Sequence, residues 1–361
     1  MTDFVKKWLR KHFSHEEAII LLFLSLAAAL VIWWLGSILA PVFAAMLFAY
    51  LLAPLVDRLD RVMPYWAALS AIFILFLGGF FLVLLLMLPV VWSQVVSLVS
   101  DIPKMLNYLQ DSLLAFADTY PETWPEIDFE ALVVHLNIDE LAMRSRPLVT
   151  FILNYSLSSL NTLFLLMIYS IVVPLMVFFL LKDRRLFWQK VQDALPRQRA
   201  ALNRIAKEVD QQVSNYVRGK AIEMMIVALV SYLVFSFFGL NYAALLAVLV
   251  GFSVLIPYVG AALVTIPVTL VALFQFGLGA QFYSIVVSYL IIQALDGNLL
   301  VPLLFSEVVN LHPLWIIIAV LVFGGLWGIW GVFFAIPLAT LVKATWHAWP
   351  SLEDDTTKSQ D

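Results

Sequence analysis

Three carboxylates within a long apolar stretch are the residues of this chain that could do chemistry. Between Ala221 and Val342 the sequence has no lysine or arginine, and its acidic residues are Glu223, Asp296 and Glu307. A charged carboxylate at the centre of a bilayer costs about 2.5 to 3.5 kcal/mol on insertion scales, so it needs an interaction that offsets this cost. Carboxylates in such a setting often bind and release a proton or a cation along a transport pathway.

Asp296 is the strongest candidate of the three because of its neighbours. It ends an apolar helical run and precedes Gly297, whose missing side chain favours a local interruption of the helix. Gln293 lies three residues earlier and therefore shares a helix face with it. We predict that the Asp296 carboxyl group contacts a proton or cation in a pathway; the alternative is that it hydrogen-bonds free backbone groups at the interruption. The predicted pathway residues are Asp296, Asn298, Gln293 and Glu307.

Glu223 has a different setting from Asp296. It follows Lys220 by three residues, so we expect it to stay at the membrane interface in a structural role. No basic residue follows within the apolar stretch. We therefore expect Asp296 to lack a basic partner from its own half of the chain.

The sequence has none of the motifs that would indicate an enzyme. It lacks the zinc-protease HExxH motif, the Gly-x-Ser-x-Gly nucleophile elbow and a Walker phosphate-binding loop. The five histidines are scattered without metal-ligand spacing, and there are no cysteines for disulfides or thiolate metal sites. No basic stripe with interleaved aromatic residues indicates nucleic-acid binding. We expect no catalytic residue, no metal, no cofactor and no nucleic-acid partner.

The composition determines which elements must position these residues. Of the 361 residues, 63% are hydrophobic and 13% are charged, and the mean hydropathy is +0.95. The apolar residues form blocks of about twenty, the length that a helix needs to cross roughly 30 Å of hydrocarbon. A membrane β-barrel would show weaker alternating segments of about ten residues. The predicted fold is an all-α polytopic membrane protein with about eight transmembrane helices.

Several apolar blocks of the second half are short and interrupted by proline or glycine. Such segments are often re-entrant or discontinuous and line a cavity. The last block, Pro313 to Val342, would measure about 45 Å as one helix, which is more than one span and less than two. A hairpin near its glycines and one steeply tilted helix both remain open. The predicted helix-breaking residues are Pro257, Gly260, Gly297, Pro302, Gly324, Gly325, Gly328 and Gly331.

The basic residues predict the orientation. They cluster at the N-terminus, after the second apolar block, and between Lys182 and Lys220, where ten basic residues face four acidic ones. Cytoplasmic flanks carry such an excess, so we expect a cytoplasmic N-terminus and, with a final hairpin, a cytoplasmic C-terminus. The predicted segments are N-terminal membrane helices (1–91), a periplasmic helical segment (92–146), a fourth membrane helix (147–181), cytoplasmic amphipathic basic helices (182–220), a C-terminal membrane half (221–345) and a cytoplasmic tail (346–361).

Three stretches of the second half resemble the signature of a known family. They are PYVG (257–260), DGNLLVP (296–302) and the region 312–339, which contains FGGLWGIWGVFFAIPLA. The family is that of the autoinducer-2 exporters, also called the PerM family. Its members commonly have Asp-Asn where this chain reads Asp296, Gly297 and Asn298. The resemblance implies a bacterial inner-membrane protein of about eight spans that forms homo-oligomers, with a pentamer as one arrangement.

Within that family some members export the signal autoinducer-2, and others are similar to sodium/proton antiporters. We therefore expect a permease or exporter of a small solute, driven by an ion gradient, with membrane lipids and a small-molecule or ion substrate as partners. The alternatives are a membrane scaffold that transports nothing, a passive oligomeric channel and a sodium/proton antiporter.

Overall fold

The protein is built from membrane-length helices. The computed structural model describes residues 39–119, 147, 150, 160–184, 186–187, 189–190, 200–257, 259–305 and 312–351. In these residues all regular elements are helical, and six helical stretches are long and apolar enough to cross a membrane. Two shorter apolar helices accompany them. The prediction of a polytopic helical membrane protein is confirmed, while the first apolar block before residue 39 lies outside the described residues.

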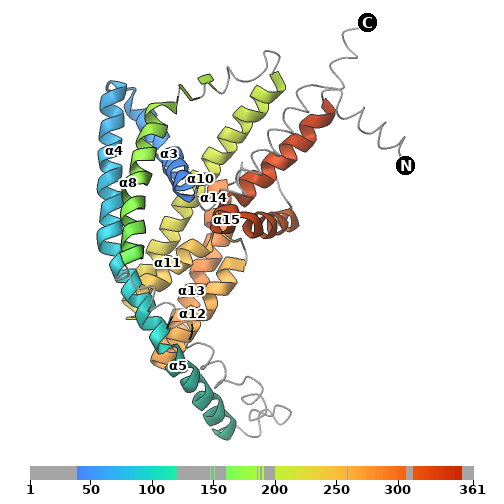
Figure 1. The fold of residues 1–361 in the computed structure, drawn as a ribbon. Coiled ribbons are helices and arrows are strands. Elements are labelled where there is room, and N and C mark those ends of the chain that lie inside the picture. The colour runs from blue at the N-terminus through green and yellow to red at the C-terminus, as the bar shows by residue number, and fades with distance from the viewer. Residues whose placement is uncertain are drawn as a thin grey trace.

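Three helices of the first half pack around one apolar cluster. α3 (Ala40–Leu59) and α4 (Tyr65–Leu82) are joined by a short turn, and α8 (Leu160–Lys182) lies against both. α4 continues through the π-helical turn η1 (Val83–Met87) into α5 (Leu88–Thr119). Figure 1 shows α4 and α8 side by side along one edge, with α5 extending past the ends of the other helices. The cluster contains Ala45, Val56, Ala68, Leu69, Val173, Val177 and Leu181.

The second half is organised around one long helix, α10 (Ala200–Phe237). This helix runs without interruption through position 220, where the sequence suggested a change from a cytoplasmic to a membrane segment. The remaining elements are α11 (Ala243–Ser253), α12 (Val259–Phe276), α13 (Ala280–Leu295), the π-helical turn η2 (Asp296–Leu300), α14 (Val301–Phe305) and α15 (Pro313–Ser351).

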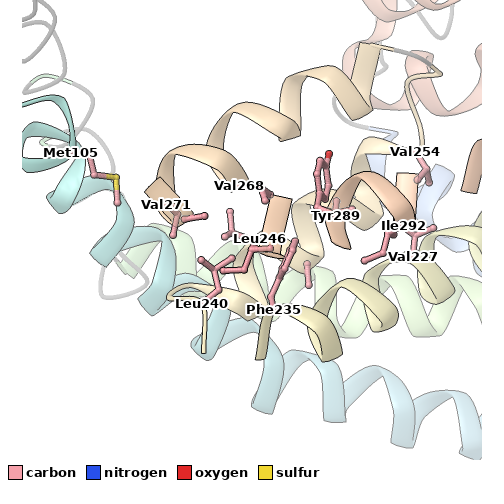
Figure 2. Close-up of a cluster of buried hydrophobic side chains, with 14 residues drawn as sticks. Met105, Val227, Phe235, Leu240, Leu246, Val254, Val268, Val271, Tyr289 and Ile292 are labelled. Carbon is pink, nitrogen blue, oxygen red and sulfur yellow. The ribbon is translucent and has the colours of Figure 1, made fainter. Parts of the chain in front are cut away.

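A large apolar cluster joins α10 to α11, α12 and α13. Figure 2 shows Phe235 of α10, Leu246 of α11, Val268 of α12 and Tyr289 of α13 in the space between these helices, as members of one cluster. Each of these four residues is 0% exposed. The rings of Phe235 and Tyr289 lie 6.4 Å apart. Burial of this much apolar surface fixes α13 against α10.

α5 is fastened to the α10–α11 connection by polar contacts. The hydroxyl of Tyr242 donates to the Asp101 carboxylate at 2.5 Å, and the backbone N–H of Leu245 donates to the Gln94 side chain at 2.8 Å. Tyr242 has a φ of 58°, in the left-handed region that residues other than glycine rarely adopt. The side chain of Met105 joins the apolar cluster from α5 (Figure 2).

The predicted interruption at Pro257 coincides with a turn of the chain. α11 ends at Ser253 and α12 begins at Val259. A Cβ atom on Gly260 would lie 1.8 Å from the carbonyl oxygen of Ser253. Glycine at this position therefore permits close backbone contact between the two helices rather than a break within one of them.

The helix does not end at Gly297 or Pro302, which is a correction to the predicted break. It continues through η2 into α14, and the N–H of Val301 bonds to the carbonyl of Asp296 five residues earlier. This is the π-helical hydrogen bond, which inserts an extra residue into a turn. Gly297 has open space around it, so neither a tight approach nor a special φ requires glycine here.

α15 contains a sharp turn at Gly328, where φ is 60° and ψ is −138°. A Cβ on Gly331 would lie 1.8 Å from the carbonyl oxygen of Phe323. Residues eight apart in a continuous helix are about 12 Å apart, so the chain folds back here, as in the hairpin alternative. Gly324 also faces a close neighbour, since its Cβ would meet Val332 at 2.8 Å, whereas Gly325 has nothing within 4 Å.

Candidate functional site

Three charged side chains are buried in the middle of the second half. Among the described residues, the buried charged side chains are those of Lys220, Glu223 and Asp296, which are 5%, 1% and 8% exposed. Lys220 and Glu223 lie on α10, and Asp296 begins η2, which packs against α10. We refer to these three residues as the buried charge cluster.

Lys220 and Glu223 form a closely paired ion pair one helical turn apart. The Lys220 Nζ atom donates to both carboxylate oxygens of Glu223, at 3.0 Å to Oε1 and 2.9 Å to Oε2. The two side chains are 6% and 1% exposed. The structure buries Glu223 among the packed helices and pairs it with the Lys220 that precedes it by three residues. Removing one partner of such a pair would leave an uncompensated buried charge.

Asp296 occupies the first position of the π-helical turn and faces the ion pair on α10. Its carboxyl group interacts electrostatically with Lys220, and Glu223 in turn interacts with Asp296. The Oδ1 atom of Asp296 is buried and has no hydrogen-bond partner among the described residues. Residues 221–342 contain no basic partner for Asp296, as expected, but the packing of η2 on α10 provides Lys220 from the position just before that stretch.

α10 and the α13–α14 segment run antiparallel, which determines the neighbours of the cluster. Phe305 of α14 lies over the Lys220 ammonium at 5.5 Å and 6.0 Å from the Tyr216 ring. A Cβ on Gly219 would lie 2.8 Å from the Phe305 ring. Glycine at position 219 therefore allows the aromatic ring to cover the backbone next to Lys220.

The other predicted pathway residues have different positions. Gln293 lies one turn before Asp296, and its Nε2 atom is buried without a hydrogen-bond partner in the described part of the chain. Asn298 is exposed, and its side chain donates to the carbonyl of Ala294 at 2.8 Å. Glu307 lies outside the described residues. Gln293 and Asp296 therefore each have a buried polar atom without a partner in the described residues, whereas the Asn298 side chain bonds to its own helix.

A row of polar groups leads away from the cluster along α13. The Tyr289 hydroxyl donates to the carbonyl of Ala261 at 3.1 Å and accepts a bond from the Thr265 hydroxyl at 3.2 Å. Tyr289, Gln293 and Asp296 follow one another at intervals of four and three residues, on one helical face. This row joins α12, α13 and η2 in the protein interior.

Apolar clusters enclose the buried charge cluster on two sides. One is the cluster of Figure 2, which includes Val227 and Ile292. The second contains Tyr216, Val217, Leu255, Ile316, Phe333 and Ile336, with Phe305 packed against it. Met224, next to Glu223 in the chain, packs against both clusters. Apolar surroundings strengthen electrostatic interactions and make an unpaired charge costly.

The charge balance of the cluster determines what it can do chemically. Two carboxylates and one ammonium carry one negative charge in excess when all three are ionised. One proton or one monovalent cation would remove this excess. Among the described residues, no group of three or more His, Cys, Asp or Glu side chains has metal-binding geometry.

Lys220 was not predicted as a site residue, and Glu223 was expected to have only a structural role. The available signal was a lysine and a glutamate three residues apart at the beginning of an apolar run, the spacing of a helical ion pair. Lys220 instead appeared to be the last residue of a basic cytoplasmic segment. The continuation of α10 through this position carries both residues into the packed interior.

Comparisons with known proteins agree with the membrane architecture. The family model described as AI-2E family transporter matches residues 19–351. The chain is 48% identical over 352 residues to the "Putative permease PerM" of Escherichia coli strain K12, covering 97% of this chain and 98% of that protein. It is 26% identical over 315 residues to the "Putative transport protein YrrI" of Bacillus subtilis strain 168, covering 86% and 87%. The chain therefore belongs to the AI-2E transporter family.

Proposed function

We propose that this protein is a gradient-driven permease that exports a small solute across the bacterial inner membrane, and that the coupling proton or monovalent cation binds at Asp296. The charge imbalance of the buried charge cluster supports this proposal. Lys220 compensates one carboxylate, and the second has a buried oxygen without a partner in the described residues. A reversible positive charge at Asp296 would balance the site.

The position of the cluster supports a transport role over a purely structural one. A buried ion pair contributes little net stability, because desolvation offsets the attraction between the charges. An additional unpaired carboxyl group in an apolar interior adds further cost. Ionisable groups retained at such a cost within membrane helices commonly mark ion pathways, and π-helical turns are frequent at functional sites.

Family membership supports the class of substrate. The matching family is named for transporters, and the relatives are named as a permease and a transport protein. We propose a small polar solute of the kind that the autoinducer-2 exporters carry. A passive oligomeric channel, a sodium/proton antiporter and a scaffold without transport activity remain the competing functions.

Asp296→Asn in proteoliposomes tests the proposal. The full chain is reconstituted with an imposed pH or sodium gradient, and export of candidate solutes from the loaded lumen is measured between pH 5.5 and 8.5. Among the described residues, the titratable groups that interact with Asp296 are Lys220 and Glu223 of α10. We expect the substitution to abolish flux or to remove its dependence on the gradient.

The matched control is Asp111→Asn, because Asp111 is an exposed carboxylate on α5 far along the chain from the cluster. This variant should transport like the unmodified protein. Gradient-dependent flux that persists unchanged in Asp296→Asn would overturn the coupling role. Flux of sodium and protons without solute would identify an antiporter, and flux that neither saturates nor follows the gradient would identify a channel.

We propose further that both termini lie in the cytoplasm and that the protein forms homo-oligomers surrounded by lipid. Large apolar side chains on the outside of α4 and η1, such as Ile74, Leu75 and Leu85, are 67%, 70% and 70% exposed, as expected for contact with lipid or with a second copy. Because the sequence has no cysteine, single cysteines near each terminus can be labelled without background from one side of the membrane. Labelling from the periplasm, or a monomeric mass in lipid nanodiscs, would contradict this arrangement.

A further inference from the structure

One buried ammonium faces two buried carboxylates, and this arrangement indicates a specific role for Lys220. Its Nζ atom bonds to Glu223 at 2.9 and 3.0 Å, and it interacts electrostatically with Asp296 across the α10–η2 contact. The Oδ1 atom of Asp296 has no hydrogen-bond partner within the described residues. The cluster therefore contains a buried acceptor, within electrostatic range of the ammonium, that the Lys220–Glu223 pair leaves unfilled.

The chemistry of lysine suits a change of partner. Its ammonium is a point charge with three donors on a flexible four-carbon stem, so it can reorient without a fixed bidentate geometry. The Phe305 ring lies 5.5 Å from Nζ and provides a further favourable contact for the cation. Asp296 and Glu223 lie on different helices, so a movement of the ammonium between them changes the interaction between α10 and η2.

We propose that Lys220 is a shared counter-ion that pairs with Glu223 while Asp296 carries the coupling proton or cation, and shifts toward Asp296 when that ligand leaves. This inference rests on the proposed function in that Asp296 binds the coupling ion. Lys220 is then a positioning residue that competes with the ion for Asp296. When the ion leaves, one ammonium balances one of the two carboxylates, so the shift of Lys220 moves the uncompensated charge from Asp296 to Glu223 and releases the Lys220–Glu223 contact.

A double-substitution cycle on the purified full chain tests the sharing without measuring transport. Melting temperatures are compared for the unmodified protein, Glu223→Gln, Asp296→Asn and the double variant. Each single change leaves the ammonium one carboxylate, so we expect each to lower the melting temperature modestly. The double variant leaves it none, and we expect a decrease at least about 5 °C larger than the sum of the single decreases.

Additive decreases in the double variant would overturn the proposal, because they would show that Lys220 does not compensate Asp296. If the double variant does not fold, Lys220→Met combined with both changes provides the second measurement. This triple variant contains no buried charge at the cluster and should fold and recover most of the lost melting temperature. Failure of the triple variant to recover would equally overturn the shared role.

The pH dependence of flux separates this inference from the proposed function. In Glu223→Gln the ammonium is free to pair permanently with Asp296, so we expect the dependence of flux on the pH gradient to be lost. Adding Lys220→Met to Glu223→Gln should restore it, which a merely structural ion pair would not predict. Non-additive melting temperatures with flux that is independent of Asp296 would refute the proposed function alone, whereas additive melting temperatures with Asp296-dependent flux would refute the shared counter-ion alone.

Discussion

Lys220→Met provides a quantitative test of how strongly the interior depends on the one buried ammonium among the residues that the structure describes. The substitution retains much of the side-chain volume and removes the charge. Lys220 and Glu223 are 6% and 1% exposed and their charged atoms lie 2.9 Å apart at the shorter contact. Breaking a buried pair by removing one partner costs about 3 to 5 kcal/mol, because the remaining charge is uncompensated. We expect a decrease of this size in the free energy of unfolding.

Lys104→Met is a control with the same spacing and the opposite environment. Lys104 and Asp101 also form a pair three residues apart on a helix, with 2.7 Å between Nζ and Oδ1, but their side chains are 71% and 24% exposed. Exposed pairs contribute about 0.2 to 1 kcal/mol. After its removal Asp101 retains the hydrogen bond from Tyr242.

Unfolding both variants in mixed micelles by denaturant titration measures the difference. We expect Lys220→Met to lose at least about 2 kcal/mol more than Lys104→Met. Losses of equal size would refute the reasoning, since they would indicate that water reaches the buried charge cluster and screens it as it does a surface pair.

Two further predictions concern the turn in α15 and the contact of α5. Gly331→Ala places a Cβ 1.8 Å from the Phe323 carbonyl oxygen, so it should destabilise the protein by about 1 to 3 kcal/mol or more. The control Gly325→Ala has nothing within 4 Å of the added Cβ, so its stability should be unchanged or rise by up to about 1 kcal/mol from helix propensity. Equal effects of the two variants in thermal unfolding would contradict the reversal of the chain. Burial and the bond to Asp101 raise the pKa of Tyr242 from 10.0 to about 12, so the folded state holds the phenol proton more tightly than the unfolded state. The resulting stabilisation is complete below pH 10.0 and is lost as the pH rises through about 12. Melting temperatures of the unmodified protein and Tyr242→Phe should therefore converge across this range, and a constant difference would show that the phenol does not titrate as the contact requires.

The helical membrane class could be predicted from local sequence, whereas the predicted helix break after Asp296 is a π-helical turn through which the helix continues. Hydrophobic blocks of about twenty residues indicate membrane helices without knowledge of their neighbours, because the bilayer provides the same apolar environment to each. The glycines near residue 328 also marked a real turn, since Gly328 adopts a positive φ. Gly297 was a weaker guide, because a π-helical turn accommodates it without a break.

The partner of Asp296 could not be predicted in the same way. Lys220 and Asp296 are far apart in the chain, and their proximity depends on the antiparallel packing of α10 against α13, η2 and α14. Hydropathy along the sequence placed Lys220 in a solvated flank, whereas its burial results from Phe305 and the surrounding apolar cluster.

The sequence by itself determined that this chain is a helical membrane protein of the AI-2E transporter family with a carboxylate inside its apolar second half, because composition and motifs are properties of consecutive residues. Only the tertiary structure decided that this carboxylate shares its interior with a lysine and a second carboxylate. Electrostatic balance depends on distances between side chains and on the exclusion of water, and both are established when the helices pack.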